Sequence, residues 1–143
     1  MNHDLSSAAR VWRLNFLLST ATLSAMAPDL EALGLAGKEF FVLDGIEDRP
    51  FPAALARYLS LSRPNLTQHL KALQARGLIS RSVDARDLRR HRLVLTDAGR
   101  ACLGQAREAL SRRYEEKLQR LSAAERAAFA GLLEKLVGGE EGA

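Results

Sequence analysis

Residues 52–95 read PAALARYLSLSRPNLTQHLKALQARGLISRSVDARDLRRHRLVL. The stretch predicts a short helix from Pro52 to Tyr58, a tight turn, and a second helix that ends near Ala75. Ser62 is a suitable N-cap for the second helix, and Pro64 lies in its first turn, where the missing N–H leaves no hydrogen bond unmade. The pattern therefore predicts two helices joined by a tight turn.

The second of these helices has an apolar face and a polar face. Leu66, Leu70 and Leu73 recur at positions i, i+4 and i+7, which predicts a buried stripe. An α-helix fits the major groove of DNA, where Asn and Gln can bond adenine and Arg can bond guanine. The exposed face is expected to carry five such polar side chains: Arg63, Asn65, Thr67, Gln68 and Lys71. The pair of helices therefore reads as a helix-turn-helix that contacts duplex DNA.

Two short strands are expected behind this pair of helices. Gly77 is expected to end the helix, and residues 78–83 and 90–95 alternate as strands do, with Leu93 and Leu95 on one face. The connection between the strands is charged, and its Arg86, Arg89 and Arg90 are long enough to reach phosphates or a narrow minor groove. The strands and their loop therefore predict a basic wing.

The charge of the chain is concentrated in the same region. The 143 residues carry a net charge of +4, from 21 Lys and Arg against 17 Asp and Glu. From Arg57 to Arg100 there are ten cations and three acids, a sum of +7, so the remainder of the chain sums to −3. A basic centre between acidic flanks indicates a surface that faces a polyanion, although a solvated arginine-rich face would give the same count.

Helices are expected on both sides of this centre. The first helix covers residues 6–26, and Pro28 and Gly34 after it should prevent its continuation. A second helix covers residues 37–46. On the other side of the centre, a long helix covers residues 97–120 after Thr96, and a last helix follows the capping box of Ser122 and Glu125. Residues from 140 to the end are expected to be disordered. The predicted fold is mainly α with a small β-wing. We expect an amino-terminal helix within residues 1–34, the DNA-binding domain at 35–98, and carboxy-terminal helices with a short tail at 99–143.

Composition excludes several other classes of protein. Leu and Ala number 49 together, whereas Val, Ile and Thr number 11, which favours helix over strand. The one cysteine excludes an intramolecular disulfide and any Cys-clustered zinc site. No apolar run is long enough to span a bilayer. The first ten residues lack the basic and then apolar pattern of a secretory signal peptide. We therefore expect a cytoplasmic protein. No catalytic constellation, phosphate loop or metal-ligand spacing is present, so we expect no enzyme and no cofactor.

Five segments occur in the order found in one family of regulators. The chain resembles the MarR family of winged-helix transcriptional regulators over about residues 5–138. The segments that carry the resemblance are Leu35-Ala-Gly-Lys-Glu-Phe-Phe-Val-Leu43, Leu55-Ala-Arg-Tyr-Leu-Ser-Leu-Ser-Arg-Pro-Asn-Leu66, Leu73-Gln-Ala-Arg-Gly-Leu-Ile79, Asp84-Ala-Arg-Asp-Leu-Arg89 and Leu93-Val-Leu-Thr-Asp-Ala-Gly99. The recognition-helix segment alone is also similar to that of ArsR-type repressors, but the metal-binding Cys and His clusters of those proteins are absent.

The resemblance implies a homodimer that reads a palindromic operator and acts as a repressor released by a small ligand. It also implies that residues 1–34 form a dimerisation helix and that residues 99–143 contain the carboxy-terminal dimerisation helices. Asp87 and Arg89 match the family's wing acid and the arginine that it orients into the minor groove. Leu88 stands where the family usually has Arg, and Ala36 and Phe51 replace polar helix caps. The groove-facing part of the recognition helix is implied to include Arg63, Pro64, Asn65, Thr67 and Gln68, after the cap Ser62.

Two further sets of residues have an ordinary structural interpretation and a functional one. Trp12, Phe16, Phe40 and Phe41 are typical of core or dimer packing, but they could also line a site for a small aromatic ligand, which the resemblance implies between the dimer helices and the winged domain. Cys102 is typical of a small core residue, with a redox sensor as the alternative.

Two other functions remain open at this stage. One is an architectural protein that binds duplex DNA without sequence preference. The other is a small-molecule-binding protein that does not bind DNA at all.

Overall fold

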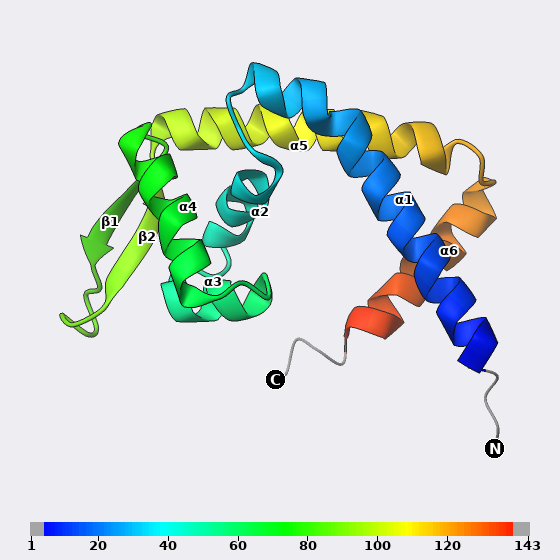
Figure 1. The fold of residues 1–143 in the computed structure, drawn as a ribbon, viewed down its shortest axis with the longest axis horizontal. Helices are drawn as coiled ribbons and strands as arrows, with labels where there is room; N and C mark the ends of the chain where they lie inside the picture. Colours follow the sequence, from blue (N-terminus) through cyan, green and yellow to red (C-terminus); the bar gives the residue numbers. More distant parts are fainter. Residues whose placement is uncertain (1–4, 139–143) are drawn as a thin grey trace. The chain divides into compact units, whose positions relative to one another are not determined.

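The computed structural model describes residues 5–138, which form a mostly helical fold with one antiparallel pair of strands (Figure 1). The predicted fold class is confirmed. Residues up to Leu110 belong to one compact unit and those from Ser111 to a second, so the boundary falls within the long helix α5. The elements are α1 Leu5–Ala32, α2 Gly37–Ile46, α3 Pro52–Tyr58, α4 Arg63–Ala75, β1 Ile79–Val83, β2 His91–Leu95, α5 Asp97–Leu118 and α6 Ala123–Val137.

The core of the first unit forms where one face of each element packs inward. Leu66, Leu70 and Leu73 are all at most 1% exposed, which confirms the predicted stripe on α4. Phe40 and Leu43 of α2 lie in the same cluster, which also contains residues from α1, α3, both strands and the first turns of α5. Burying this stripe forces the opposite face of α4 to point toward solvent.

The strands form the predicted wing. β1 pairs antiparallel with β2, with Ile79 opposite Leu95 and Val83 opposite His91. Each strand begins one residue later than the sequence predicts. Leu93 and Leu95 are buried, as expected from the alternation. The Leu93 N–H donates to the carbonyl of Pro50 at 2.7 Å, so the loop before α3 is bonded directly to β2.

The first helix corrects one expectation. Pro28 does not end it: the helix runs through Pro28 to Ala32 and stops before Gly34, which has a φ of +69°. Proline removes only one N–H from the helix, and the burial of Met26 and Leu30 on either side holds the last turns against the core. The left-handed Gly34 then ends the helix, as the sequence predicts for a glycine at this position.

The predicted helix caps are mostly present. The Ser62 hydroxyl accepts from the Asn65 N–H at 3.3 Å, and Gly77 ends the recognition helix with a φ of +72°. In α6, the box of Ser122 and Glu125 forms with both hydrogen bonds. Hydrogen bonding to Ser122 lowers the pKa of Glu125, because those bonds favour its ionised form.

The ends of the described chain present apolar side chains to solvent. Leu5, Val11 and Leu14 of α1 are more than half exposed, and so are Leu132 and Leu136 of α6. None of the described helices is both long and apolar enough to cross a membrane. The expected disordered tail lies outside the described residues.

Candidate nucleic-acid interface

The recognition helix α4 presents the predicted polar residues to solvent. Arg63, Pro64, Asn65, Thr67, Gln68 and Lys71 are all exposed. Two hydroxyls in this region are already engaged: that of Ser62 caps the helix, and that of Thr67 donates to the Arg63 carbonyl at 2.8 Å. The remaining side chains keep their amide, guanidinium and ammonium groups available for base edges and phosphates.

The turn before α4 sets the angle of this helix. Ser60 adopts a φ of +53°, and the N–H of Leu61 donates to the Ala56 carbonyl at 2.9 Å. Leu55 and Ala56 are buried, so α3 is anchored in the core while its end reverses direction into α4. Figure 1 shows α3, the start of α4 and the wing loop along the same lower edge of the first unit.

The tip of the wing holds one arginine in a defined orientation. One carboxylate oxygen of Asp87 accepts from the Arg89 backbone N–H at 3.0 Å and from its Nε at 3.4 Å. The Arg89 side chain is nevertheless 92% exposed, so its outer N–H groups remain free for another acceptor. The loop is closed by two backbone bonds, from Asp84 to Arg90 and from Arg90 to Asp87. Asp87 thus restricts the orientation of Arg89 through two hydrogen bonds; that the pair serves DNA binding, as the resemblance implies, stays a prediction.

The arginines at the base of the wing are arranged differently. The Arg90 guanidinium lies over the ring of Phe51 at 3.7 Å, and that of Arg92 lies 5.8 Å from the same ring. Together with Arg86, they line a hollow of about 580 Å³ between the wing loop and the start of α3. The sequence predicts that Arg86 and Arg90 contact DNA, whereas Phe51 stands out in the sequence only as the replacement of a polar helix cap.

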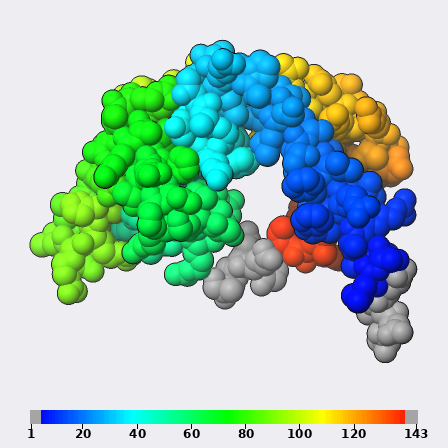
Figure 2. Space-filling view, in the orientation of Figure 1, coloured from blue at the N-terminus to red at the C-terminus, as the bar shows by residue number. Residues whose placement is uncertain are grey.

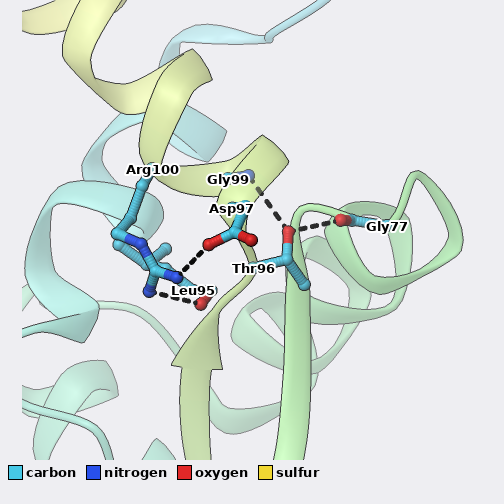
Figure 3. A network of polar contacts seen from close by, with 6 residues as sticks. All are labelled: Gly77, Leu95, Thr96, Asp97, Gly99 and Arg100. Carbon is cyan, nitrogen blue, oxygen red and sulfur yellow. Dashed lines mark hydrogen bonds and ion pairs between the residues drawn. The ribbon is translucent and has the colours of Figure 1, made fainter.

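The wing is tied to α5 by a compact polar network (Figure 3). The Thr96 hydroxyl donates to the Gly77 carbonyl at 2.5 Å and accepts from the Gly99 N–H at 3.0 Å. Arg100 donates to the Leu95 carbonyl at 2.9 Å and pairs with Asp97 at 2.5 Å. The network joins the end of α4, the end of β2 and the first turn of α5, so Thr96 caps the long helix as predicted.

Arg76, at the end of the recognition helix, has a role that sequence reasoning missed. Its guanidinium donates to the carbonyls of Gly34 and, at 2.8 Å, Leu33, and it lies 3.9 Å from Glu39. It therefore bonds the C-terminal end of α1 to the end of α4. No local pattern signals this contact, because the partners lie more than 40 positions apart in the chain.

Known proteins resemble this chain in sequence and in fold. The MarR family model matches residues 33–90, which include α2, the helix-turn-helix and the wing loop. A MarR-family transcriptional regulator from Silicibacter pomeroyi has a similar structure, with a TM-score of 0.74 and 25% identity over 88% of this chain and 86% of that one. The chain is therefore similar to MarR-family regulators, in sequence over its central residues and in fold over most of its length.

Two further proteins are similar to this chain. The transcriptional repressor CouR, in a structure bound to a 23-mer DNA duplex, has a TM-score of 0.73 and 29% identity, covering 96% of this chain and 97% of that one. A protein from Thauera aromatica, whose name assigns it to transcriptional regulation of the hcr operon, is 33% identical over 84 residues. That alignment covers 59% of this chain and 51% of the relative, so the chain matches about half the length of that protein. Both of these relatives are described as regulators of transcription, not as enzymes.

The four aromatic residues proposed for ligand binding lie in two pairs. Trp12 and Phe16 stack on α1 with ring centroids 5.4 Å apart and are 65% and 50% exposed. Phe40 and Phe41 make an edge contact at 5.2 Å, with Phe40 buried in the core and Phe41 36% exposed. Among the described residues, no cluster of His, Cys, Asp and Glu could hold a metal ion.

Cys102 packs against the core and is half-buried. Burial raises the pKa of its thiol above the ordinary value, and the charge of Arg76 offsets part of that increase. A raised pKa leaves little thiolate at neutral pH, so this environment favours the structural interpretation of Cys102 over the redox sensor.

Proposed function

We propose that this protein is a sequence-specific regulator of transcription that binds duplex DNA as a homodimer and represses its target. The observation that carries the proposal is the pairing, within one unit, of an exposed polar face on α4 with a wing arginine held by Asp87. The first of these features suits base edges in the major groove, and the second suits phosphates or a minor groove. We place the DNA-binding domain at residues 35–98, between dimerisation segments at 1–34 and 99–143.

Dimer formation is supported by the exposed apolar side chains of α1. Val11, Trp12, Leu14, Phe16 and Leu17 are each at least half exposed, and a helix that is apolar on several sides is usually covered by a partner. A second copy would cover these side chains and would present two recognition helices to the two halves of a palindrome. Half-sites one helical turn apart require a spacing of about 34 Å between those helices.

Repression and ligand control are the finer parts of the proposal. Repression is supported by the similarity to CouR, a transcriptional repressor whose structure matches this chain over nearly the whole length of both. A small aromatic ligand bound near Trp12, Phe16, Phe40 and Phe41 would act by changing the spacing of the two recognition helices. The protein would act in the cytoplasm, where it can reach the chromosome.

The proposal is tested by selecting bound fragments from the source genome and measuring their affinity by fluorescence anisotropy. We expect a palindromic consensus that binds much more tightly than a scrambled duplex of equal length. Gln68→Ala should reduce this preference, because its side chain is placed to bond a base, whereas Lys71→Ala should weaken binding to both duplexes alike.

Two results would contradict the proposal. Equal affinity for the selected and the scrambled duplex would indicate an architectural DNA-binding protein. Absence of binding at about 50 mM salt, where phosphate contacts are strong, would indicate a protein that does not use DNA.

A further inference from the structure

We propose that Phe51 and Arg90 form a preorganised phosphate contact at the base of the wing, separate from the tip arginine Arg89. The inference rests on the proposed DNA-binding function and adds a site to it. The carrying observation is the stacked geometry: the Arg90 guanidinium carbon lies 3.7 Å from the centre of the Phe51 ring. The ligand class is a phosphodiester of the DNA backbone, which does not depend on base sequence.

The position of Phe51 is fixed by the backbone around it. Phe51 is the N-cap of α3, but its side chain makes no capping hydrogen bond, and Pro52 follows it as the first helical residue. The carbonyl of Pro50, one residue earlier, accepts from the Leu93 N–H of β2 at 2.7 Å. Since this bond ties the loop to the strand that begins beside Arg90, the ring and the guanidinium are brought together by the fold itself.

The stacking leaves the hydrogen-bonding edge of Arg90 available. A guanidinium that lies over an aromatic ring uses its face, whereas its N–H groups point outward in the plane. Among the described residues, Arg86, Arg90 and Arg92 make no ion pair, although all three line the same hollow. Three cations against Asp84 and Asp87 leave this hollow with an excess of positive charge.

The location fits a DNA backbone better than a base edge. The hollow lies between the wing loop and the start of α3. Figure 1 shows that the wing loop and α3 lie on the same edge of the unit as the start of α4. Figure 2 shows the wing as a projection at the margin of the green surface formed by α3 and α4. A duplex read by α4 would pass its backbone along this edge. A planar, fixed guanidinium suits the paired oxygens of a phosphate.

The test is a double-mutant cycle on the full chain, with a labelled duplex of arbitrary sequence and anisotropy read at several salt concentrations. Arg90→Ala should weaken binding and reduce the magnitude of the salt slope by about 0.9, as for one lost phosphate contact. Phe51→Ala should weaken binding about two- to five-fold, the range for an exposed cation–π contact. In the Arg90→Ala background, Phe51→Ala should cause no further loss.

Three controls separate stacking from simple packing. Phe51→Trp keeps the stacking face and should bind as the wild type does, whereas Phe51→Leu keeps an apolar side chain without a ring and should bind as Phe51→Ala does. Arg120→Ala, which removes the same charge from the second unit, should leave the salt slope unchanged. A thermal melt of each variant shows whether it is folded, and Phe51→Leu decides the matter if Phe51→Ala is not.

The outcomes distinguish this inference from the proposed function. If the wild type binds duplex but Arg90→Ala leaves affinity and slope unchanged, or the effects of Phe51→Ala and Arg90→Ala simply add, the phosphate contact is wrong and the function stands. If Phe51→Leu binds as tightly as the wild type, the ring does not act through stacking. If the wild type itself ignores duplex DNA in dilute salt, both the function and the contact are wrong.

Discussion

At Gly99 the first turn of α5 passes directly against the backbone of the connection between α4 and β1. A Cβ atom at this position would lie 1.9 Å from the Leu78 carbonyl oxygen, which also accepts a hydrogen bond from the Thr96 N–H. Neither backbone segment can move without breaking the network of Figure 3. The glycine of the Leu-x-Leu-Thr-x-x-Gly segment is therefore explained by close approach of two backbone segments rather than by an unusual φ.

We expect Gly99→Ala to destabilise the protein by about 2 kcal/mol or more, in the upper range for overpacking, because the methyl group overlaps backbone atoms. The measurement is urea denaturation at fixed protein concentration. Gly104→Ala is the matched control: the same helix has open space at that position, and replacing a helical glycine should stabilise by about 0.5–1 kcal/mol. A Gly99→Ala protein as stable as the wild type would mean that α5 starts elsewhere.

Cys102 provides a second prediction for a single residue. Because burial raises the pKa of its thiol, the thiolate fraction at any given pH should be lower than in a short peptide. The rate of iodoacetamide alkylation, followed against pH, should therefore have its midpoint above that of a cysteine peptide. The midpoint reports the pKa whatever the access to the thiol. A midpoint below that of the peptide would restore the redox-sensor alternative.

The wing contains an acidic side chain, Asp87, that we expect to strengthen the binding of DNA although both carry negative charge. Removing Asp87 removes a negative charge near DNA, which by Coulomb's law alone should strengthen binding. Removing it also frees Arg89 from the two hydrogen bonds that orient it. We expect orientation to dominate, so Asp87→Ala should bind more weakly than the wild type.

Arg89→Ala is the reference for this prediction. It should weaken operator binding and lower the magnitude of the salt slope by about one, whereas Asp87→Ala should weaken binding with the slope largely kept. Asp87→Asn retains an acceptor for the Arg89 N–H and should lie between the two extremes. Tighter binding by Asp87→Ala would show that its carboxylate only repels DNA.

The bounds and the two faces of the recognition helix are determined by residues of the helix itself and by its cap. Ser62, Pro64 and the leucine stripe lie within thirteen positions of one another, and each acts on neighbours one to four residues away. The sequence therefore predicted the helix, its buried face and its exposed face correctly. Helix α1 behaved differently: its passage through Pro28 depends on burial of Met26 and Leu30 against other elements.

The exposed apolar side chains of α1 predict that the protein associates with a second copy of itself. Trp12→Ala combined with Phe16→Ala should shift the protein toward monomer in sedimentation velocity, because the two stacked rings are the largest exposed apolar side chains of that helix. Leu88→Ala, which truncates an exposed side chain on the wing, should leave the oligomer unchanged. An intact dimer in the double variant would refute the role assigned to α1.

The sequence by itself determined the order of the helices and strands, several of their caps, the buried stripe of α4 and the polar residues exposed on its opposite face. These features depend on periodicity and on hydrogen bonds within a few residues, which a sequence records directly. Only the tertiary structure decided where Arg76 and Arg90 point. The first bonds carbonyls more than 40 positions away, and the second lies over Phe51 because β2 is bonded beside the loop before α3. Such contacts depend on how elements pack, which no local pattern encodes.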